Sequence, residues 1–424
     1  MLTAVREGDT GTVIRLARHA KGATQRQTGD ACGYSQSEIS RIENGQARVH
    51  DIRILERLAR RLDIPPQLLG LAPFDIDPDW SVRRREFLTR AASGAAAAML
   101  TANGRDSPGL ADLLMPSGSA PHDSPALVGL EKRIASAHAI YQRGEYQHVA
   151  DGLPALIGCT TNGTVLAEDE RSRQRVLAAQ GWSFVLAAKL ATKFDDPPAA
   201  RLAADRAITA GTFSASRVLQ GAATYQLACA LEAGGERAHA EQVAAIGADH
   251  VAAVGDQDPS LISVRGALLL IAAMAASAQG DPAASSRYLA DAQRLAERLG
   301  TDCNHAWTGF GPTNVRTHTL AAAVRLDQPD RAVEIANQID TDSFAPGLVG
   351  RRCQVHIEAA LAHARQGHDT EVVEHLTRVE RMGPQVLRCN QQAQQLIVDL
   401  LRRSRRSAAP ALRGLAHYAA PVGA

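Results

Sequence analysis

Residues 24–45, TQRQTGDACGYSQSEISRIENG, determine how the first part of this chain folds. The stretch predicts two short helices joined by a tight turn, the second with one polar face. Ser35 and Glu38 form a capping-box pattern, in which the Ser hydroxyl accepts the backbone N–H of Glu38 and the Glu carboxylate accepts that of Ser35. The second helix is therefore expected to begin at Gln36.

The two faces of this second helix differ in chemistry. At 100° per residue, Ile39 and Ile42 share one side and are expected to pack inward. The opposite side is polar and carries Gln36, Ser37, Ser40 and Arg41. Gln pairs with adenine and Arg with guanine, and Ser adapts to donors or acceptors, so this face has the chemistry of base recognition. An ordinary solvated helix is the alternative, but Gly29 and Gly33, where two helices would approach and turn, favour recognition.

Residues 10–71 resemble the phage-repressor type of helix-turn-helix domain, the Xre group. Three segments carry the resemblance: TQ at residues 24–25, SQSEISRIENG at 35–45 and LERLARRLDIPPQLLGL at 55–71. The resemblance implies an all-α DNA-binding domain of five helices, at residues 12–22, 24–32, 36–45, 53–62 and 66–69. Its expected partner is a double-stranded DNA operator.

The resemblance also implies a role for each residue of the DNA-binding surface. Gln25, which opens the first helix of the motif, would grip a phosphate and brace the recognition helix. The residues expected to face base edges are Gln36, Ser37 and Arg41. Ser40 and Asn44 would lie nearer the DNA backbone.

Two further positions in this domain concern its structure. The resemblance pairs Arg18 with Glu43 in a mostly buried ion pair, whose expected role is to fix helix orientation, since such pairs add little net stability. Thr28 departs from the family pattern, because an apolar residue usually packs inward there. We therefore expect the helix that carries Thr28 to be packed slightly more loosely.

The charge of this domain favours a dimer. Residues 1–70 carry eleven Lys or Arg and eight Asp or Glu, a net charge of +3, and the whole chain is formally +1. Phosphate neutralisation supplies much of the affinity for DNA, so one weakly basic domain is not expected to hold a unique operator alone. Domains of this type read two half-sites about one helical turn apart. The sequence thus predicts a homodimer on a roughly palindromic operator.

The rest of the 424-residue chain is predicted to be helical and repetitive. It is rich in Ala and Leu, and only 4% of the chain is aromatic. Turn signals recur every 40 to 50 residues or so, at residues 144–146, 194–197, 235–238, 280–283, 326–329 and 367–369. A helix hairpin cannot bury its apolar face alone, so the pattern predicts a tetratricopeptide-like α-solenoid. An irregular helical bundle is the alternative.

Composition also suggests where the domains divide. Residues 1–72 would form the helix-turn-helix domain. Residues 73–125 would be a linker, with an amphipathic helix around residues 82–100 followed by a hinge rich in Gly, Ser and Pro. Residues 126–424 would form the repeat domain, which we expect both to sense a ligand and to dimerise.

The whole-chain plan resembles a group of actinobacterial transcriptional regulators and, more distantly, the peptide-sensing quorum receptors of Gram-positive bacteria. Residues 304–318, NHAWTGFGPTNVRTH, look most like the actinobacterial group, in which a GPTNV-like segment opens a repeat helix. Both resemblances imply that a small-molecule or peptide effector in the solenoid alters the spacing of two DNA-reading domains. The implied location is the cytoplasm.

The same segment is the candidate effector site. It gathers aromatic and polar side chains in an otherwise aromatic-poor chain, as pockets do. The candidate residues are Asn304, Trp307, Phe310, Asn314, Arg316 and His318. The alternative is that Thr313 or Asn314 caps the next helix and the rings fill a junction between repeats. Arg351 and Arg352 would suit a ligand carboxylate, although paired arginines are more often solvated.

No enzyme, cofactor or metal site is predicted. The six cysteines are scattered without zinc spacing, and no Walker loop, G-x-S-x-G or H-E-x-x-H motif occurs. His356 and His363 share one predicted helix with Glu358, but seven-residue spacing does not suit a single chelate. The apolar run after Val82 is too short to span a membrane, so no membrane partner is expected.

Two functions remain open at this point. The first is a ligand-responsive, sequence-specific transcription regulator. The second is an interaction protein whose repeats hold a protein partner. A small pocket near Trp307 would favour the first, and a long open groove with spread charges would favour the second.

Overall fold

The structure is a computed structural model, and it describes residues 10–32, 34–44, 46–47, 57–59, 61–62, 64, 127–167, 169–253, 258–403 and 410–418. Every regular element in these ranges is helical, which confirms the all-α prediction. The chain divides into two compact units, residues 1–106 and 107–424, which are considered separately. The predicted linker helix, the hinge and the helix at residues 66–69 lie outside the described residues, and the predicted domain boundaries stay predictions.

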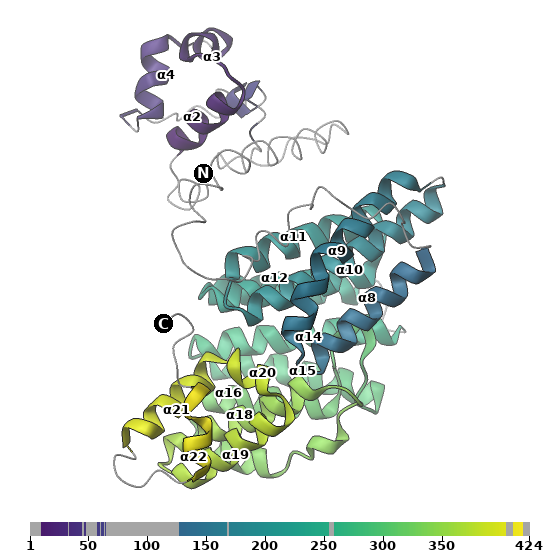
Figure 1. Cartoon of the computed structure of the whole chain (residues 1–424), viewed down its shortest axis with the longest axis vertical. Coiled ribbons are helices and arrows are strands. Elements are labelled where there is room, and N and C mark those ends of the chain that lie inside the picture. Colours follow the sequence, from purple (N-terminus) through teal and green to yellow (C-terminus); the bar gives the residue numbers. More distant parts are fainter. Residues whose placement is uncertain are drawn as a thin grey trace. The chain divides into compact units, whose positions relative to one another are not determined.

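The first unit contains the predicted helix-turn-helix. Its helices are α2 (Thr10–Ala20), α3 (Gln25–Cys32) and α4 (Gln36–Glu43), shown in Figure 1. Both hydrogen bonds of the Ser35–Glu38 capping box are present, and α4 begins at Gln36 as predicted. Ile39 and Ile42 are buried, which confirms the predicted inner face of α4. They pack in one core with Val13, Ile14, Ala17, Cys32, Leu58, Ala59, Leu62 and Ile64.

The turn between α3 and α4 requires a glycine at position 29. A Cβ atom on Gly29 would lie 2.4 Å from the carbonyl oxygen of Tyr34. The Tyr34 N–H donates to the Gly29 carbonyl at 2.9 Å, so the chain cannot move away without losing this bond. The predicted close approach is therefore found at Gly29, while Gly33 lies outside the described residues.

The second unit consists, within its described part, of six successive helix hairpins and a terminal helical segment (Figure 1). The hairpins are α8 (Leu127–Gln142) with α9 (Tyr146–Leu166), α10 (Glu170–Lys193) with α11 (Pro197–Phe213), α12 (Arg217–Ala233) with α13 (Arg237–Ala252), α14 (Pro259–Ala278) with α15 (Pro282–Leu299), α16 (Pro312–Arg325) with α17 (Pro329–Asn337), and α18 (Val349–Arg365) with α19 (Asp369–Met382). The segment is α20 (Pro384–Arg388), α21 (Gln391–Arg403), α22 (Pro410–Leu415) and η4 (Ala416–Tyr418). Two short 3-10 turns, η2 (His305–Trp307) and η3 (Thr341–Ser343), lie in the loops on either side of the fifth hairpin.

The same tight turn closes all six hairpins, at the six places that the sequence predicts. Each turn has one residue with positive φ: Gly144, Asp195, Gly235, Gly280, Asp327 and Gly367. The residue that follows donates its N–H back into the preceding helix, as Asp281 does to the Ala276 carbonyl at 3.0 Å. Glycine adopts this conformation without strain, and aspartate tolerates it better than most residues.

Small side chains let the paired helices pack closely. On α11, Ala200, Ala203, Ala204 and Ala207 are all fully buried. The central helix α14 is long and apolar enough, by length and composition, to cross a membrane. However, 83% of its most apolar window is buried inside the unit, which identifies α14 as a core helix of the repeats.

The last hairpin and the terminal segment that follows it pack against the first hairpin and share a core with the second. One hydrophobic core contains Tyr146 and Leu186 from α9 and α10 together with Ile357 and Leu387 from α18 and α20. The backbone N–H of Gln147 donates to the Gln385 side chain. The repeats therefore wrap around a central cavity instead of extending as an open array.

Candidate functional site

The outer face of α4 presents most of the predicted DNA-binding residues to solvent. Gln36, Ser37, Arg41 and Asn44 are exposed, and Ser40 is half-buried. The inner face of the same helix is fixed in the core by Ile39 and Ile42. Five polar groups are thus available on a helix whose orientation is set by packing, which is the arrangement that base recognition requires.

A chain of polar contacts fixes α4 to the two helices that precede it. The buried Arg18 guanidinium on α2 donates to both Glu43 carboxylate oxygens, at 2.6 and 2.8 Å. Gln25, at the start of α3, donates its amide to Glu43 at 2.9 Å, and Gln36 donates to the Gln25 side-chain oxygen at 3.0 Å. Burial alone would raise the pKa of Glu43, but the bonds from Arg18 and Gln25 hold that pKa below its usual value.

Thr28 faces the interior of the first unit. Its side chain is 1% exposed, and the hydroxyl has no hydrogen-bond partner among the described residues. An apolar side chain of the same shape would fill this position without an unpaired polar group. Thr28, which stands where the family usually has an apolar residue, therefore destabilises the first unit by burying an unpaired hydroxyl.

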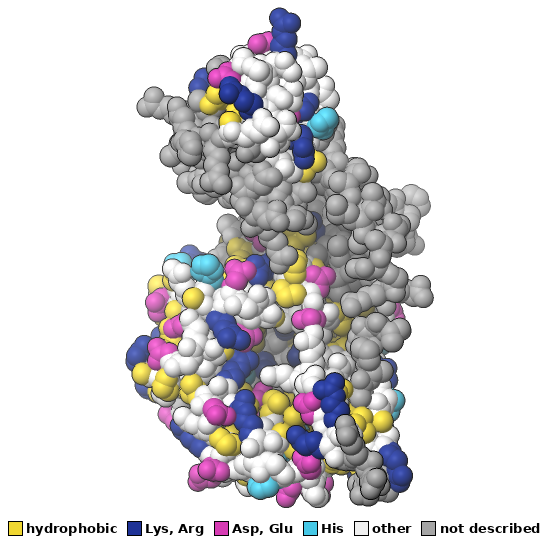
Figure 2. Space-filling model, turned by 90° about the vertical axis from the view of Figure 1, so that its left-hand side faces the viewer, with side chains coloured by type: hydrophobic (Ala, Val, Ile, Leu, Met, Phe, Trp, Pro, Cys, Tyr) yellow, Lys and Arg dark blue, Asp and Glu magenta, His cyan; other side chains and the backbone are white. Residues whose placement is uncertain are grey.

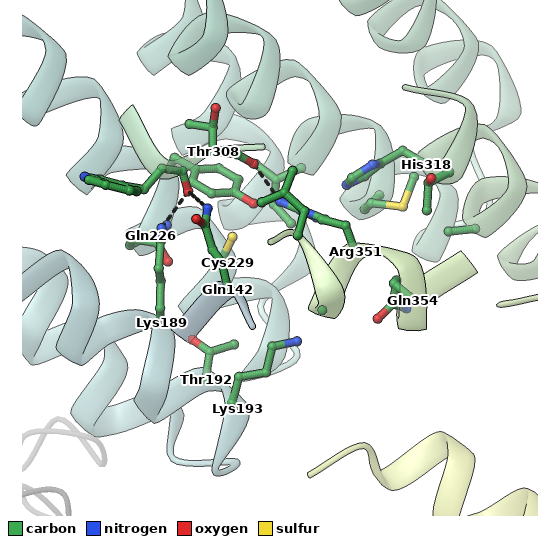
Figure 3. A pocket seen from close by; sticks show the side chains of 18 of the residues that line it. Gln142, Lys189, Thr192, Lys193, Gln226, Cys229, Thr308, His318, Arg351 and Gln354 are labelled. Carbon is green, nitrogen blue, oxygen red and sulfur yellow. Dashed lines mark hydrogen bonds between the residues drawn. The ribbon is translucent and has the colours of Figure 1, made fainter. Parts of the chain in front are cut away.

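The second candidate site is the central cavity of the repeat unit, with a volume of about 250 Å³. It is lined by the first helix of each hairpin, by Tyr146 at the start of α9 and by the loop before α16 (Figure 3). Its aromatic walls are Tyr141, Tyr146, Tyr225 and Trp307. Its charged residues are Lys189, Lys193, Arg325, Arg351 and Glu358. Apolar walls with a few charged groups are the usual make-up of a small-molecule site.

The residues predicted for the effector site do not all reach this cavity. Trp307 and His318 line it, and Asn304 exchanges two hydrogen bonds with the lining residue Gln142, at 2.6 and 2.7 Å. Phe310 is fully buried in a repeat core, where its ring lies against Gly266.

Asn314 and Arg316 lie elsewhere on α16. Asn314 is buried and does not line the cavity, and Arg316 is exposed to solvent. Helix α16 begins at Pro312, so consecutive residues of the motif point in different directions around it.

The alternative interpretation of this segment holds in part. A carboxylate does cap the start of α16, but it belongs to Asp302, which accepts the Thr313 N–H at 3.0 Å. The Phe310 ring fills a junction between repeats, as that alternative proposed. The Trp307 indole instead stacks on His138 at 5.0 Å, beside the cavity.

The loop before α16 crosses the cavity and is held there by two cations. The Lys189 ammonium donates to the Trp307 carbonyl at 2.8 Å, and the Arg351 guanidinium donates to the Thr308 carbonyl at 3.0 Å (Figure 3). Ala306 and Trp307 both have positive φ, at 49° and 57°. Two consecutive non-glycine residues in this region store strain that the surrounding contacts must offset.

Lys189 and Lys193 are the residues that sequence reasoning missed. They are two of only four lysines in the chain, and they sit four residues apart on a helix rich in Ala and Leu. That rarity was the available signal. Of the two arginines that would suit a ligand carboxylate, Arg351 lines the cavity and Arg352 does not.

Burial and like charge perturb the lysines of the cavity. Burial, followed by repulsion from Arg351, lowers the pKa of Lys189 from 10.5 to about 7. The same two causes lower the pKa of Lys193. At the other side of the cavity Arg325 pairs with Glu232 at 3.0 Å, and burial raises the pKa of Glu358. The carboxylates of Glu232 and Glu358 therefore act on Arg325.

A group of histidines lies on the last hairpin, away from the cavity. His356 of α18 and His375 of α19 approach through their Nδ1 atoms at 3.0 Å, and His363 stacks on His375. Within the described ranges, no group of three or more His, Cys, Asp or Glu residues is placed to hold a metal ion. All six cysteines are free.

Comparisons with known proteins identify the first unit. The sequence model of a family described as a helix-turn-helix domain matches residues 10–71. No curated protein sequence matches the chain. Among solved structures, the crystal structure of Bacillus thuringiensis PlcR in complex with the peptide PapR7 and DNA is similar, at 13% identity and a TM-score of 0.31, over 91% of this chain and 98% of that one. The chain thus carries a helix-turn-helix domain, a DNA-binding fold, at residues 10–71.

Proposed function

We propose that the chain is a sequence-specific transcription regulator of the Xre type, and that it acts as a homodimer on a palindromic operator. One observation carries the proposal. The face of α4 that carries the predicted base-contacting residues is exposed, while the buried Arg18–Glu43 pair and the Gln25–Gln36 bond hold that helix in place. A recognition helix that is already held in position loses less conformational entropy when it binds DNA.

The second part of the proposal is that an effector bound in the helical repeats controls DNA binding. The cavity of about 250 Å³ at Trp307 supports this reading over a protein scaffold, because a scaffold needs a long open groove. The face of the repeats seen in Figure 2 has acidic and basic side chains interspersed, without the single-sign field that would attract a highly charged partner. The chain would act in the cytoplasm of an actinobacterial host.

Mapping of the protein across the host genome tests this function, followed by titration of the bound sites with purified protein at a stated salt concentration. We expect discrete sites with two half-sites about one helical turn apart and a complex containing two chains. Binding without preference between these sites and random DNA would contradict the proposal.

A further inference from the structure

We propose that the effector is a small molecule bearing a carboxylate or phosphate group, and that Lys189, Lys193 and Arg351 bind this group inside the repeat cavity. The inference rests on the proposed function, because it names the chemical class of the effector. It goes beyond that function by assigning the binding residues.

Three cations from two helices face one cavity. Lys189 and Lys193 are separated by one turn of α10, and Arg351 lies in the first turn of α18. In Figure 3 the two lysines extend from one helix and Arg351 extends from another. One guanidinium and two ammonium groups can together surround the oxygens of one anion, and the planar guanidinium can bind two of them.

No carboxylate of the described residues pairs with these three cations. Lys189 and Arg351 donate to the neutral carbonyls of Trp307 and Thr308 in the hydrogen bonds described above. Their other contacts are also with neutral groups, since Arg351 is hydrogen-bonded to Tyr225 and the Lys189 ammonium lies over the Tyr141 ring, 5.8 Å from its centroid. Among the described residues, neither a hydrogen bond nor a salt bridge ends on the Lys193 ammonium. Like charges held in a poorly solvated cavity repel each other, so this arrangement is unfavourable until an anion enters.

The acidic residues nearby act on another cation. Glu232 pairs with Arg325, and Glu358 accepts a hydrogen bond from Gln354 at 2.7 Å. The charged neighbours that perturb Lys193 include Arg351 but neither of these carboxylates. The cavity therefore has an unneutralised basic side, and a ligand with a negative charge complements it.

The size of the cavity favours a small molecule over a peptide. Its volume of about 250 Å³ lies just below the range of roughly 300–1,000 Å³ that is typical of small-molecule sites. The rings of Tyr141, Tyr225 and Trp307 supply flat apolar walls beside the cations. A compact anion with a planar or apolar body fits this combination.

Thermal unfolding of the full chain tests the inference. The parent chain and every variant carry Trp80→Phe, so that the fluorescence of Trp182 and Trp307 reports on the repeat unit. The probes are inorganic phosphate and succinate, each titrated against sodium chloride of equal ionic strength. The test variant is Lys193→Met, with Arg351→Gln as a second, and Lys132→Met is the matched control because Lys132 is exposed on α8. Circular dichroism verifies that each variant keeps its helix content.

We expect at least one probe to raise the unfolding temperature of the parent chain and of Lys132→Met. Lys193→Met and Arg351→Gln should need at least about tenfold more of the probe for the same rise, since each loses a charge-assisted contact. Without any probe, Lys193→Met should unfold at a higher temperature than the parent chain, whereas Lys132→Met should not.

The two probes separate the two sources of the anion. A response to phosphate alone assigns a phosphate-bearing effector, a response to succinate alone assigns a carboxylate, and a response to both supports the shared site. Equal responses of Lys193→Met and Lys132→Met, or no response beyond that to chloride, would overturn the inference. Operator binding by the same variants tests the proposed regulatory function separately. If the chain binds its operator but responds to neither anion, only the proposed anion site is wrong.

Discussion

Gln25 and Gln36, on the two helices of the helix-turn-helix, are hydrogen-bonded to each other at 3.0 Å. The same Gln25 side chain donates to Glu43, which Arg18 also binds. A predicted phosphate contact and a predicted base-contacting residue are thus bonded directly to each other, and Gln25 connects both to one buried ion pair. Loss of Gln25 removes its own contact and also releases Gln36 from its preferred position.

Arg41→Ala and Gln25→Ala should affect DNA binding differently. Arg41 is exposed on the outer face of α4, so its loss should weaken binding to the specific operator by about 1–3 kcal/mol and binding to random DNA much less. Gln25→Ala should weaken both. Fluorescence anisotropy at one fixed salt concentration measures the four affinities, with Arg143→Ala in the repeat unit as a control. Equal losses on both DNAs for Arg41→Ala would show that Arg41 does not read bases.

Thr28→Val should stabilise the helix-turn-helix unit by about 1 kcal/mol, because it removes a buried hydroxyl that has no partner. Thr24→Val provides a control that should lower the stability of the same unit. The Thr24 hydroxyl accepts the Gln27 N–H at the start of α3, so its loss should cost about 1 kcal/mol. Hydrogen exchange of α3 in the full chain measures both changes. Slower exchange in Thr24→Val than in Thr28→Val would contradict this account.

Phe310→Ala should destabilise the repeat unit by about 3–5 kcal/mol, because the ring is fully buried. Gly266→Ala should also destabilise it, since a Cβ atom there would lie 2.1 Å from the Phe310 ring. In the double variant the clash is absent, so the cost should be smaller than the sum of the two. Denaturant unfolding tests this cycle. Arg316→Ala, at an exposed position, is the control and should change stability by less than about 0.5 kcal/mol.

Lys189→Met should stabilise the repeat unit in a pH-dependent manner. The pKa of Lys189 is about 7 in the folded chain and has its ordinary value of 10.5 when unfolded, so the unfolded chain binds the extra proton between these values. Lys189 therefore lowers the free energy of unfolding by its full amount below pH 7, and this destabilisation disappears as the pH rises through 10.5. We expect Lys189→Met to raise the free energy of unfolding by about 2–5 kcal/mol at pH 6, and this gain should shrink steadily by pH 10. The loss of the hydrogen bond to the Trp307 carbonyl reduces the gain at every pH.

Urea unfolding at several pH values measures this effect. Lys132→Met is again the control, because its exposed side chain should give no gain at any of them. A gain for Lys189→Met that stayed constant from pH 6 to pH 10 would mean that the lysine is not held at a lowered pKa.

The sequence by itself determined the features that depend on neighbouring residues. The capping box at Ser35 fixes where α4 begins, and the period of Ile39 and Ile42 fixes its inner face. The six hairpin turns follow from short signals such as Gly280-Asp281-Pro282, where glycine permits positive φ and proline begins the next helix. Each of these effects acts over a few residues, so a linear sequence is sufficient to reveal it.

Only the tertiary structure decided what surrounds the cavity. Lys193 and Arg351 meet because the last hairpin packs back onto the first and shares a core with the second, and no local pattern encodes that closure. The sequence marks residues 304–318 as unusual in composition, but their side chains divide between cavity, core and solvent because α16 turns by 100° per residue at an orientation set by its neighbours. Contacts between distant residues depend on how whole helices pack, and the arrangement of charges in the cavity is a result of that packing.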